Sequence, residues 1–128
     1  MQNQQKIRAE AQAAIDLIVR DVKSAKAVVI SSEDGFEVAA YVENTTQVTR
    51  MSAMASSLSA LGALAGEESR LGECRNIIIE ADAGILIIIQ VRRAEETLIM
   101  SVITGTDAVV GQILYVAKQA ARMLQTST

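Results

Sequence analysis

The two shortest connections in the sequence constrain the fold most, because they join three strand-like segments. Between Cys74 and Gly105 the chain reads CRNIIIEADAGILIIIQVRRAEETLIMSVITG, in which the apolar runs are separated only by Asp82-Ala83-Gly84 and by the longer RRAEE segment. Parallel strands need a crossover of about a dozen residues or more, so connections this short make the three strands antiparallel. Residues 77–79 and 85–89 are continuously apolar, as expected for strands that are covered on both faces.

A second hairpin is predicted upstream, around Asp34-Gly35. Two β-rich runs flank SSEDG, where glycine tolerates a positive φ and aspartate can hydrogen-bond to its own backbone. The second run alternates, which is typical of a half-exposed strand at a sheet edge. One side carries Phe36, Val38, Ala40 and Val42, and the other side carries Glu37, Tyr41 and Glu43.

Apolar residues at steps of three and four predict helices at both ends of the chain. The first helix is expected over residues 4–24, and the last is expected to be capped by Thr106 or Asp107 and to end near Gln125. The expected buried positions are Ile7, Ala11, Ala14, Ile15, Ile18 and Val22 in the first helix, and Val110, Ile113, Leu114, Ala117, Ala121 and Leu124 in the last.

With one more helix between the two groups of strands, the element order is α-β-β-α-β-β-β-α. Helices on two faces of an antiparallel sheet form an α+β sandwich, and a chain of 128 residues is long enough for one such core. We therefore predict a single domain over residues 1–128, with flexible ends at 1–5 and 126–128.

The middle helix carries no charged side chain over residues 51–66, MSAMASSLSALGALAG. It is expected to follow an N-cap at Thr46 and to run to about Arg70, with Gly72 beyond it as a stop. At about 100° per residue, the bulky residues share one arc, which we expect to pack on the sheet: Met51, Met54, Leu58, Leu61 and Leu64. The opposite arc carries small residues where a solvated helix would carry charges: Ser52, Ser56, Ser59, Ala63 and Gly66.

We predict that this small-residue arc meets a second protein subunit. Small side chains let another backbone approach closely, and Gly62 and Gly66 each cost about 1 kcal/mol relative to alanine in a helix interior. The alternative is an alanine- and serine-rich helix whose back faces water. The strand with Ile77, Ile78 and Ile79 supports an interface, because it begins the meander and would leave an apolar edge open. Pairing with the same strand of a second copy would cover both surfaces around one two-fold axis.

The composition argues against catalysis, metal binding and cofactor binding. The chain has no histidine for acid–base chemistry near neutrality and only one cysteine, so neither a His/Cys metal cluster nor an internal disulfide is expected. Its glycines form no phosphate-cradling motif. The net charge of −3 comes without a Lys/Arg run, which does not suggest nucleic-acid binding. A polar N-terminus and the lack of a membrane-length apolar run predict a soluble cytoplasmic protein with no membrane insertion.

Three features each allow a functional and a simpler interpretation. Cys74 could be a reactive thiol, but a structural half-buried thiol is favoured. Thr104-Gly105-Thr106 could hold an anion at a helix N-terminus, but ordinary capping explains it. Arg92 or Arg93 could act as an arginine finger on a GTPase, but the glutamates of the same RRAEE segment favour a loop of mixed charge.

The sequence resembles the Roadblock/dynein light chain domain family, and bacterial MglB-like members in particular. The resemblance covers about residues 15–124 and rests on several stretches in order. These are VVISSEDGFEVAA, the small-residue second helix, EADAGILIII and the final TGTDAVVGQILYVAKQAARML. It implies a five-stranded antiparallel sheet in the order 2-1-5-4-3, with the second helix on one face and the terminal helices on the other.

The resemblance also implies a function in protein binding. Such domains form homodimers or heterodimers through the third strand and second helix. They act without catalysis, as platforms for small Ras-like GTPases or as adaptors in motor and signalling complexes. We therefore expect a homodimer that binds a small Ras-like GTPase and modulates its nucleotide cycle, with a dimeric adaptor that does not contact a GTPase as the alternative. The implied GTPase contacts are the outer arc of the second helix with Arg50, Glu67 and Arg70 at its ends.

Overall fold

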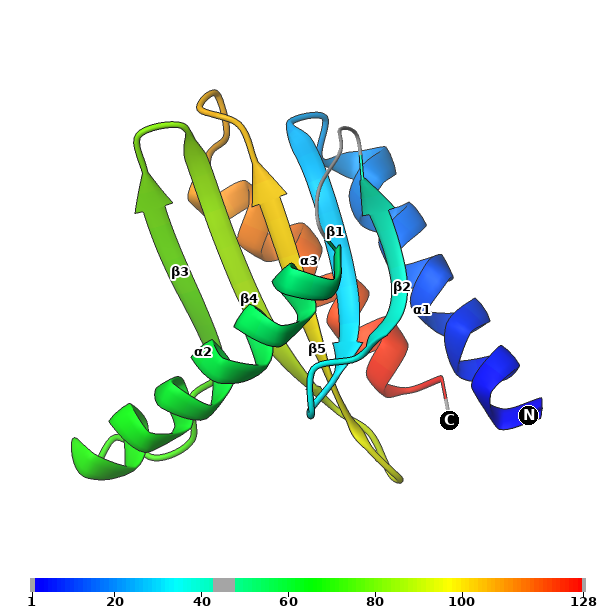
Figure 1. Ribbon diagram of the computed structural model, residues 1–128. Helices are drawn as coiled ribbons and strands as arrows, with labels where there is room; N and C mark the ends of the chain where they lie inside the picture. The colour runs from blue at the N-terminus through cyan, green and yellow to red at the C-terminus, as the bar shows by residue number, and fades with distance from the viewer. Residues whose placement is uncertain (1, 43–47, 128) are drawn as a thin grey trace.

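Five antiparallel strands form one sheet with helices on both faces (Figure 1). The computed structural model describes residues 2–42 and 48–127. The elements are α1 (Gln2–Asp21), β1 (Ala25–Ser32), β2 (Glu37–Val42), α2 (Val48–Glu68), β3 (Asn76–Ala81), β4 (Gly84–Arg92), β5 (Thr97–Thr104) and α3 (Val110–Gln125). The strand order is β2-β1-β5-β4-β3. The predicted α+β sandwich and its strand order are therefore confirmed. None of the described helices is long and apolar enough to span a membrane.

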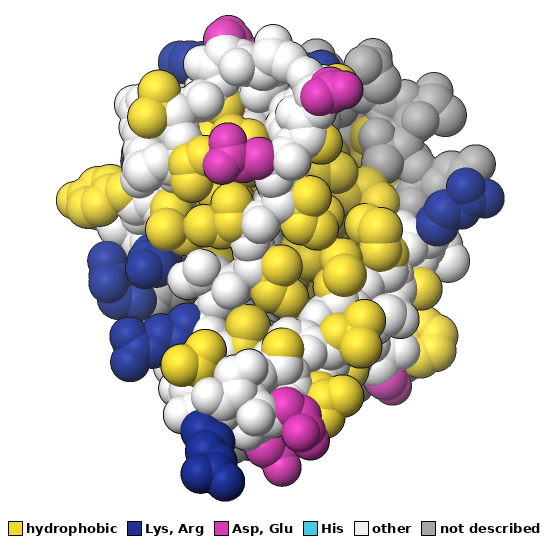
Figure 2. Space-filling view, turned by 90° about the vertical axis from the view of Figure 1, so that its left-hand side faces the viewer, with side chains coloured by type: hydrophobic (Ala, Val, Ile, Leu, Met, Phe, Trp, Pro, Cys, Tyr) yellow, Lys and Arg dark blue, Asp and Glu magenta, His cyan; other side chains and the backbone are white. Residues whose placement is uncertain are grey.

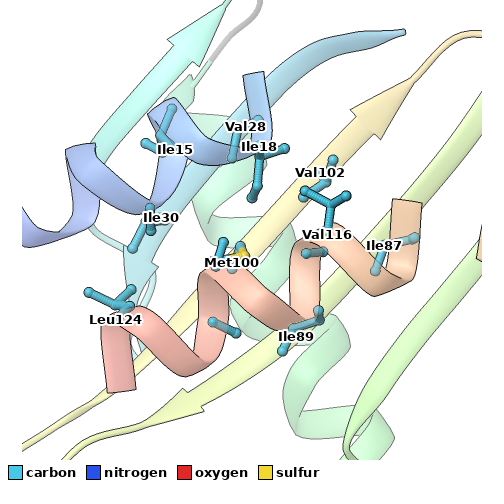
Figure 3. Packing of buried hydrophobic residues seen from close by; sticks show 14 of the residues in the cluster. Ile15, Ile18, Val28, Ile30, Ile87, Ile89, Met100, Val102, Val116 and Leu124 are labelled. Carbon is cyan, nitrogen blue, oxygen red and sulfur yellow. The ribbon is translucent and has the colours of Figure 1, made fainter. Parts of the chain in front are cut away.

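The larger core lies between the sheet and the helices α1 and α3 (Figure 3). Ile15 and Ile18 of α1 and Leu124 of α3 are completely buried against aliphatic residues of the central strands. Alanines at 0–8% exposure occupy the buried sides of both helices, where small side chains let helices pack closely: Ala11, Ala14, Ala117, Ala120 and Ala121. The buried faces predicted for the first and last helices are thus confirmed, with Ile7, Val110 and Leu114 only partly buried.

A buried ion-pair network fastens the β4–β5 loop to both helices of this face. The Arg93 side chain is 3% exposed, and its Nη2 lies 2.7 Å from Glu10 Oε1 of α1. Its Nε lies 2.7 Å from Glu96 Oε1, and its Nη1 donates a hydrogen bond to the Leu124 carbonyl of α3 at 2.8 Å. Removal of the arginine would leave the Glu10 carboxylate partly buried without its partner, which is destabilising.

The predicted cap of the last helix was wrong. The last helix begins at Val110, and its N-cap is Val109, which makes no side-chain capping hydrogen bond. Thr106 and Asp107 instead form a turn, because the Gly105 N–H donates to the Ser24 carbonyl and holds the chain beside the α1–β1 connection. The predicted cap Thr46 lies outside the described residues. Residues 2–5, expected to be a flexible end, lie in α1.

The edge strand β2 is half-buried as predicted, but its most buried residue was not predicted. Phe36 is 70% exposed and precedes the strand, whereas Ala39 is 5% exposed. Helices cover both sides of this edge, since α1 and α2 each contact β2. The alternation of residues in β2 therefore does not distinguish a solvent-exposed side of the strand from a buried one. Glu43 lies outside the described residues.

Candidate partner-binding face

Helix α2 lies on the sheet in the opposite orientation from the one predicted. The small residues Ser52 and Ser59 are 0% and 4% exposed, and Gly66 is also buried. Met54, Leu61 and Leu64, expected to pack on the sheet, are 40%, 60% and 52% exposed. Of the bulky arc, Met51 is buried and Leu58 is half-buried. The prediction that the bulky arc packs on the sheet and the small-residue arc faces outward is thus wrong for most residues of both arcs.

Ser56 and Ser59 of α2 form hydrogen bonds with the sheet and one of its turns. Ser56 Oγ donates a 2.7 Å hydrogen bond to the Glu33 carbonyl in the β1–β2 turn. Ser59 Oγ accepts a 3.3 Å hydrogen bond from Gln90 Nε2 on β4. Ala55, one residue before Ser56, packs on Ile88 and Ile99. This half of α2 lies close to the sheet, and bulkier side chains in the same places would hold it away.

The two glycines of α2 accommodate the chain's own return toward β3. A Cβ on Gly62 would lie 2.9 Å from both Cys74 Sγ and Ile77 Cδ1, and a Cβ on Gly66 would collide with the Gly72 carbonyl oxygen. Leu71 N–H also donates to the Gly66 carbonyl at 2.8 Å. The predicted close approach therefore exists, but at Gly66 the approaching backbone belongs to the same chain. Gly72 has a φ of +91° and follows the end of the helix as predicted.

The exposed apolar residues of α2 continue onto the edge strand β3. We call this surface the α2–β3 face and define it by its exposed large hydrophobic residues, of which Ile78 lies on the side of β3 away from α2: Met54, Leu61, Leu64, Leu71, Ile78 and Ile79. Figure 2 views the molecule from this side and shows hydrophobic side chains gathered over its centre. Figure 1 shows the C-terminal part of α2 extending past the β3 edge of the sheet.

A groove of about 590 Å³ lies within this face, between α2, the chain that follows it and the start of β3. Its apolar walls include Leu58, Leu61, Ala65, Leu71 and Ile77. Exposed apolar areas of this kind mark contacts with other proteins when they are contiguous. The uncharged stretch of residues 51–66 forms one wall, so no charge interrupts the apolar surface there.

The edge of β3 has unpaired backbone groups. Within the described residues, β3 pairs only with β4 and ends the sheet. Ile78 and Ile79 are each 39% exposed on this edge, and Ile77 is half-buried beneath α2. An apolar edge strand without charges on its central residues is a template for pairing with another strand. The open third strand expected from the sequence is therefore present.

The remaining predicted contact residues are on the surface. Ala63 is exposed, Ser56 is half-buried, and Arg50, Glu67 and Arg70 are exposed at the two ends of α2. Arg70 has a φ of +58° just past the helix. Leu71, at 83% exposure, belongs to the face but was not predicted. Its position after the helix, outside the periodic pattern, gave no signal.

The candidate chemical groups are engaged in structural contacts. Cys74 is half-buried, and its thiol donates to the Asn76 carbonyl at 3.5 Å. Arg93 is enclosed in the network described above, and Arg92 lies 2.7 Å from Glu73. Thr104-Gly105-Thr106 does not adjoin the first turn of α3, so it forms neither the helix cap nor an anion site at that helix terminus. Across residues 2–42 and 48–127, no group of His, Cys, Asp or Glu side chains could hold a metal ion.

Comparison with solved structures places the fold among Roadblock/LC7 domains. The chain superimposes on Myxococcus xanthus MglB with a TM-score of 0.81 and 16% identity, covering 92% of this chain and 86% of that one. A Roadblock/LC7 domain from Streptomyces avermitilis gives a TM-score of 0.73 at 23% identity, covering 82% and 86%. An MglB structure with a tetrameric arrangement gives 0.73 at 15% identity, covering 94% and 93%. No protein-family model matches the sequence, and no curated protein matches it.

Proposed function

We propose that two copies of this chain pair through the α2–β3 face, and that the homodimer is a non-catalytic cytoplasmic regulator of a small Ras-like GTPase. The observation that carries the proposal is the exposed apolar surface of the α2–β3 face, which includes the open edge of β3. We infer the role of the homodimer in the nucleotide cycle of a GTPase from the sequence resemblance to Roadblock domains and from the MglB-like fold.

A homodimer accounts for both exposed parts of the face at once. Pairing of β3 with its own copy is antiparallel around a two-fold axis perpendicular to the sheet, which satisfies the open backbone groups. Such an axis keeps both α2 helices on one face of the joined sheet. The overhanging end of α2 then lies toward the partner, where Leu61 and Leu64 can be covered. The tetrameric arrangement of an MglB with the same fold supports self-association.

The charged ends of α2 support a second partner on the helical face. Arg50 lies in the first turn of α2, Glu67 lies in its last turn and Arg70 follows its end, so charged residues border the uncharged stretch at both ends. Protein interfaces commonly have an apolar centre and a polar rim, and rim charges mainly set the rate and specificity of association. We propose these three residues as contacts with the GTPase.

A binding measurement with a small Ras-like GTPase encoded beside this gene tests the regulatory role. We expect binding that differs between the GDP-bound and GTP-analogue-bound forms, and about tenfold weaker binding for the variant R50E/R70E. The variant R8E is the matched control, because Arg8 is an exposed arginine on α1 at the other face of the sheet.

Binding that is absent in both nucleotide states would contradict the GTPase role. If the protein is still a dimer in that case, the result favours the alternative of a structural adaptor in a signalling or motor complex. Equal weakening by R8E and R50E/R70E would instead place the GTPase contact outside the ends of α2.

A further inference from the structure

A second pocket, which shares Arg75 and Asn76 with the apolar groove, is lined by cations that have no acidic partner among residues 2–42 and 48–127. It has a volume of about 170 Å³ and lies between the start of β3, the end of β4 and the C-terminal half of α3. Arg75, Lys118 and Arg122 line it together with the uncharged residues Asn76, Gln90 and Gln125. Among the described residues none of the three cations forms a salt bridge, and no carboxylate lines the pocket. Figure 2 shows a group of Lys and Arg side chains to the left of the hydrophobic area.

The opposite end of β3 carries the complementary charge. Glu80 is exposed near the end of the strand, and Asp82 follows in the turn. Asn76, Ile78 and Glu80 pair with Ile89, Ile87 and Ile85, all of which belong to the core beneath α1 and α3. Since paired residues in a sheet point to the same face, Glu80 lies on the face that also carries the basic pocket. The strand is therefore acidic at one end and adjoins uncompensated cations at the other.

We infer that, in the homodimer, Glu80 of each subunit enters the basic pocket of the other. The inference rests on the dimer proposed above and specifies its register. With both α2 helices on one side, residues opposite each other must share a face, so the pairing is centred on a residue. Centring on Ile78 sets Ile77 opposite Ile79 of the partner subunit and Asn76 opposite Glu80 of the partner subunit. Directly opposed residues have Cβ atoms about 5 Å apart, which brings that carboxylate to the pocket that Asn76 lines.

The neighbouring registers are less favourable for physical reasons. Centring on Ile79 places Ile78 opposite the partner's Glu80, which sets an apolar side chain against a carboxylate. Centring on Ile77 places Ile79 of the partner subunit opposite Arg75 and leaves the pocket without an acidic side chain. Only the register centred on Ile78 pairs isoleucines with one another and supplies a carboxylate to each pocket. Because the contact is symmetric, it forms twice in one dimer.

Cysteine cross-linking tests the register. In a Cys74→Ser background, Ile78→Cys places one cysteine directly opposite its own copy, within the range that a disulfide spans. We expect Ile78→Cys to form a disulfide-linked dimer in high yield, and Ile77→Cys and Ile79→Cys to do so much less. Dominant cross-linking through residue 77 or 79 would overturn the inferred register and leave the dimer itself intact.

Charge reversal tests the contact. We expect Glu80→Arg to weaken the dimer roughly tenfold or more, and K118E/R122E to weaken it similarly, because two ion pairs are lost and like charges meet. The triple variant E80R/K118E/R122E should recover most of the affinity. Glu37→Arg, on the β2 edge, is the matched control and should leave the affinity unchanged.

The outcomes separate this inference from the proposed dimer. An unchanged dimer with Glu80→Arg, or a triple variant no tighter than the single variants, would refute the Glu80 contact while the dimer stands. A wild-type protein that is monomeric at every concentration would refute the dimer and the contact together. Circular dichroism spectra matching the wild type would establish that each variant is folded.

Discussion

The two faces of the sheet are packed to different degrees. Between the sheet and α1 and α3, one continuous core includes buried residues from both helices and four strands, and the Arg93 network holds the β4–β5 loop at its rim. Between the sheet and α2 there are two small clusters around Met51 and Ala55, and the Ser31, Ser52 and Ser101 hydroxyls have no partner in the described part of the chain.

The difference shows on which face of the sheet the chain covers its own apolar surface. On the α1 and α3 face, apolar surface is covered within the chain, so that face stabilises the subunit. On the α2 face, small side chains bring the helix close, while Leu61 and Leu64 of the same helix point outward. The proposal assigns those leucines and the β3 edge to a partner. Substitutions on the two faces should therefore separate folding from association.

The largest expected contrast is between Ile87→Ala and Ile78→Ala, which are neighbours across β3 and β4. Ile87 is fully buried, so its truncation should lower the free energy of unfolding by about 4 kcal/mol through lost burial and a cavity. Ile78 is 39% exposed, and its truncation should cost about 1 kcal/mol in dilute solution. Urea denaturation followed by circular dichroism measures both. Equal losses would mean that β3 is as much a part of the subunit core as β4.

On the α1 and α3 face, Arg93→Ala should lower the free energy of unfolding nearly as much as Ile87→Ala. The substitution leaves Glu10, whose side chain is 14% exposed, without its ion-pair partner, and removes the hydrogen bond to the Leu124 carbonyl. We expect a loss of about 3 kcal/mol in the free energy of unfolding. Arg92→Ala is the matched control, because the Arg92–Glu73 pair is exposed and should contribute less than about 1 kcal/mol.

Glycine substitutions should have opposite effects in α2 and α3. Gly66→Ala places a Cβ against the Gly72 carbonyl oxygen and should destabilise the fold by about 2 kcal/mol, despite the higher helix propensity of alanine. Gly111 in α3 has open space around it, so Gly111→Ala should stabilise by up to about 1 kcal/mol. Thermal denaturation of the pair measures the contrast. A stabilising Gly66→Ala would refute the close return of the chain beside α2.

Serine substitutions in α2 should give the smallest effects. Ser56→Ala removes the hydrogen bond to the Glu33 carbonyl and should cost about 1 kcal/mol. Ser52→Ala removes a buried hydroxyl that has no partner in the described residues, so it should be neutral or slightly stabilising. If Ser52→Ala were the more harmful of the two, a polar contact at Ser52 would have to exist.

Local signals in the sequence were sufficient to predict the elements and the antiparallel pairing of the last three strands, whereas the strand order followed from the family resemblance. The connections at residues 82–83 and 93–96 are too short for a crossover, so they determine that the strands they join are antiparallel. The periodicity of α1 and α3 predicts their buried sides correctly because each helix buries one face in the same core. The open β3 edge was also predictable, because the first strand of a meander has one neighbour along the chain.

The orientation of α2 was not predictable from its own residues. Bulk alone favoured Met54, Leu61 and Leu64 as the buried arc, but the sheet-facing side is determined by contacts with distant segments. Ser56 contacts the β1–β2 turn, and Gly66 contacts the backbone at Gly72. The prediction of where α3 begins was wrong for a similar reason. The Gly105 N–H donates a hydrogen bond to the Ser24 carbonyl, and the helix begins later than its own residues predicted. Tertiary contacts decided these features.

The most direct test of partner binding at the α2–β3 face is the molar mass in solution, measured by light scattering over a range of concentrations. A homodimer through this face predicts twice 13.7 kDa for the wild type. Ile78→Asp would bury two unpaired charges at the joined edges and should give 13.7 kDa, whereas the control Tyr115→Asp, on the exposed side of α3, should remain dimeric. A wild-type mass of 13.7 kDa at every concentration, or an unchanged dimer with Ile78→Asp, would contradict the proposed interface.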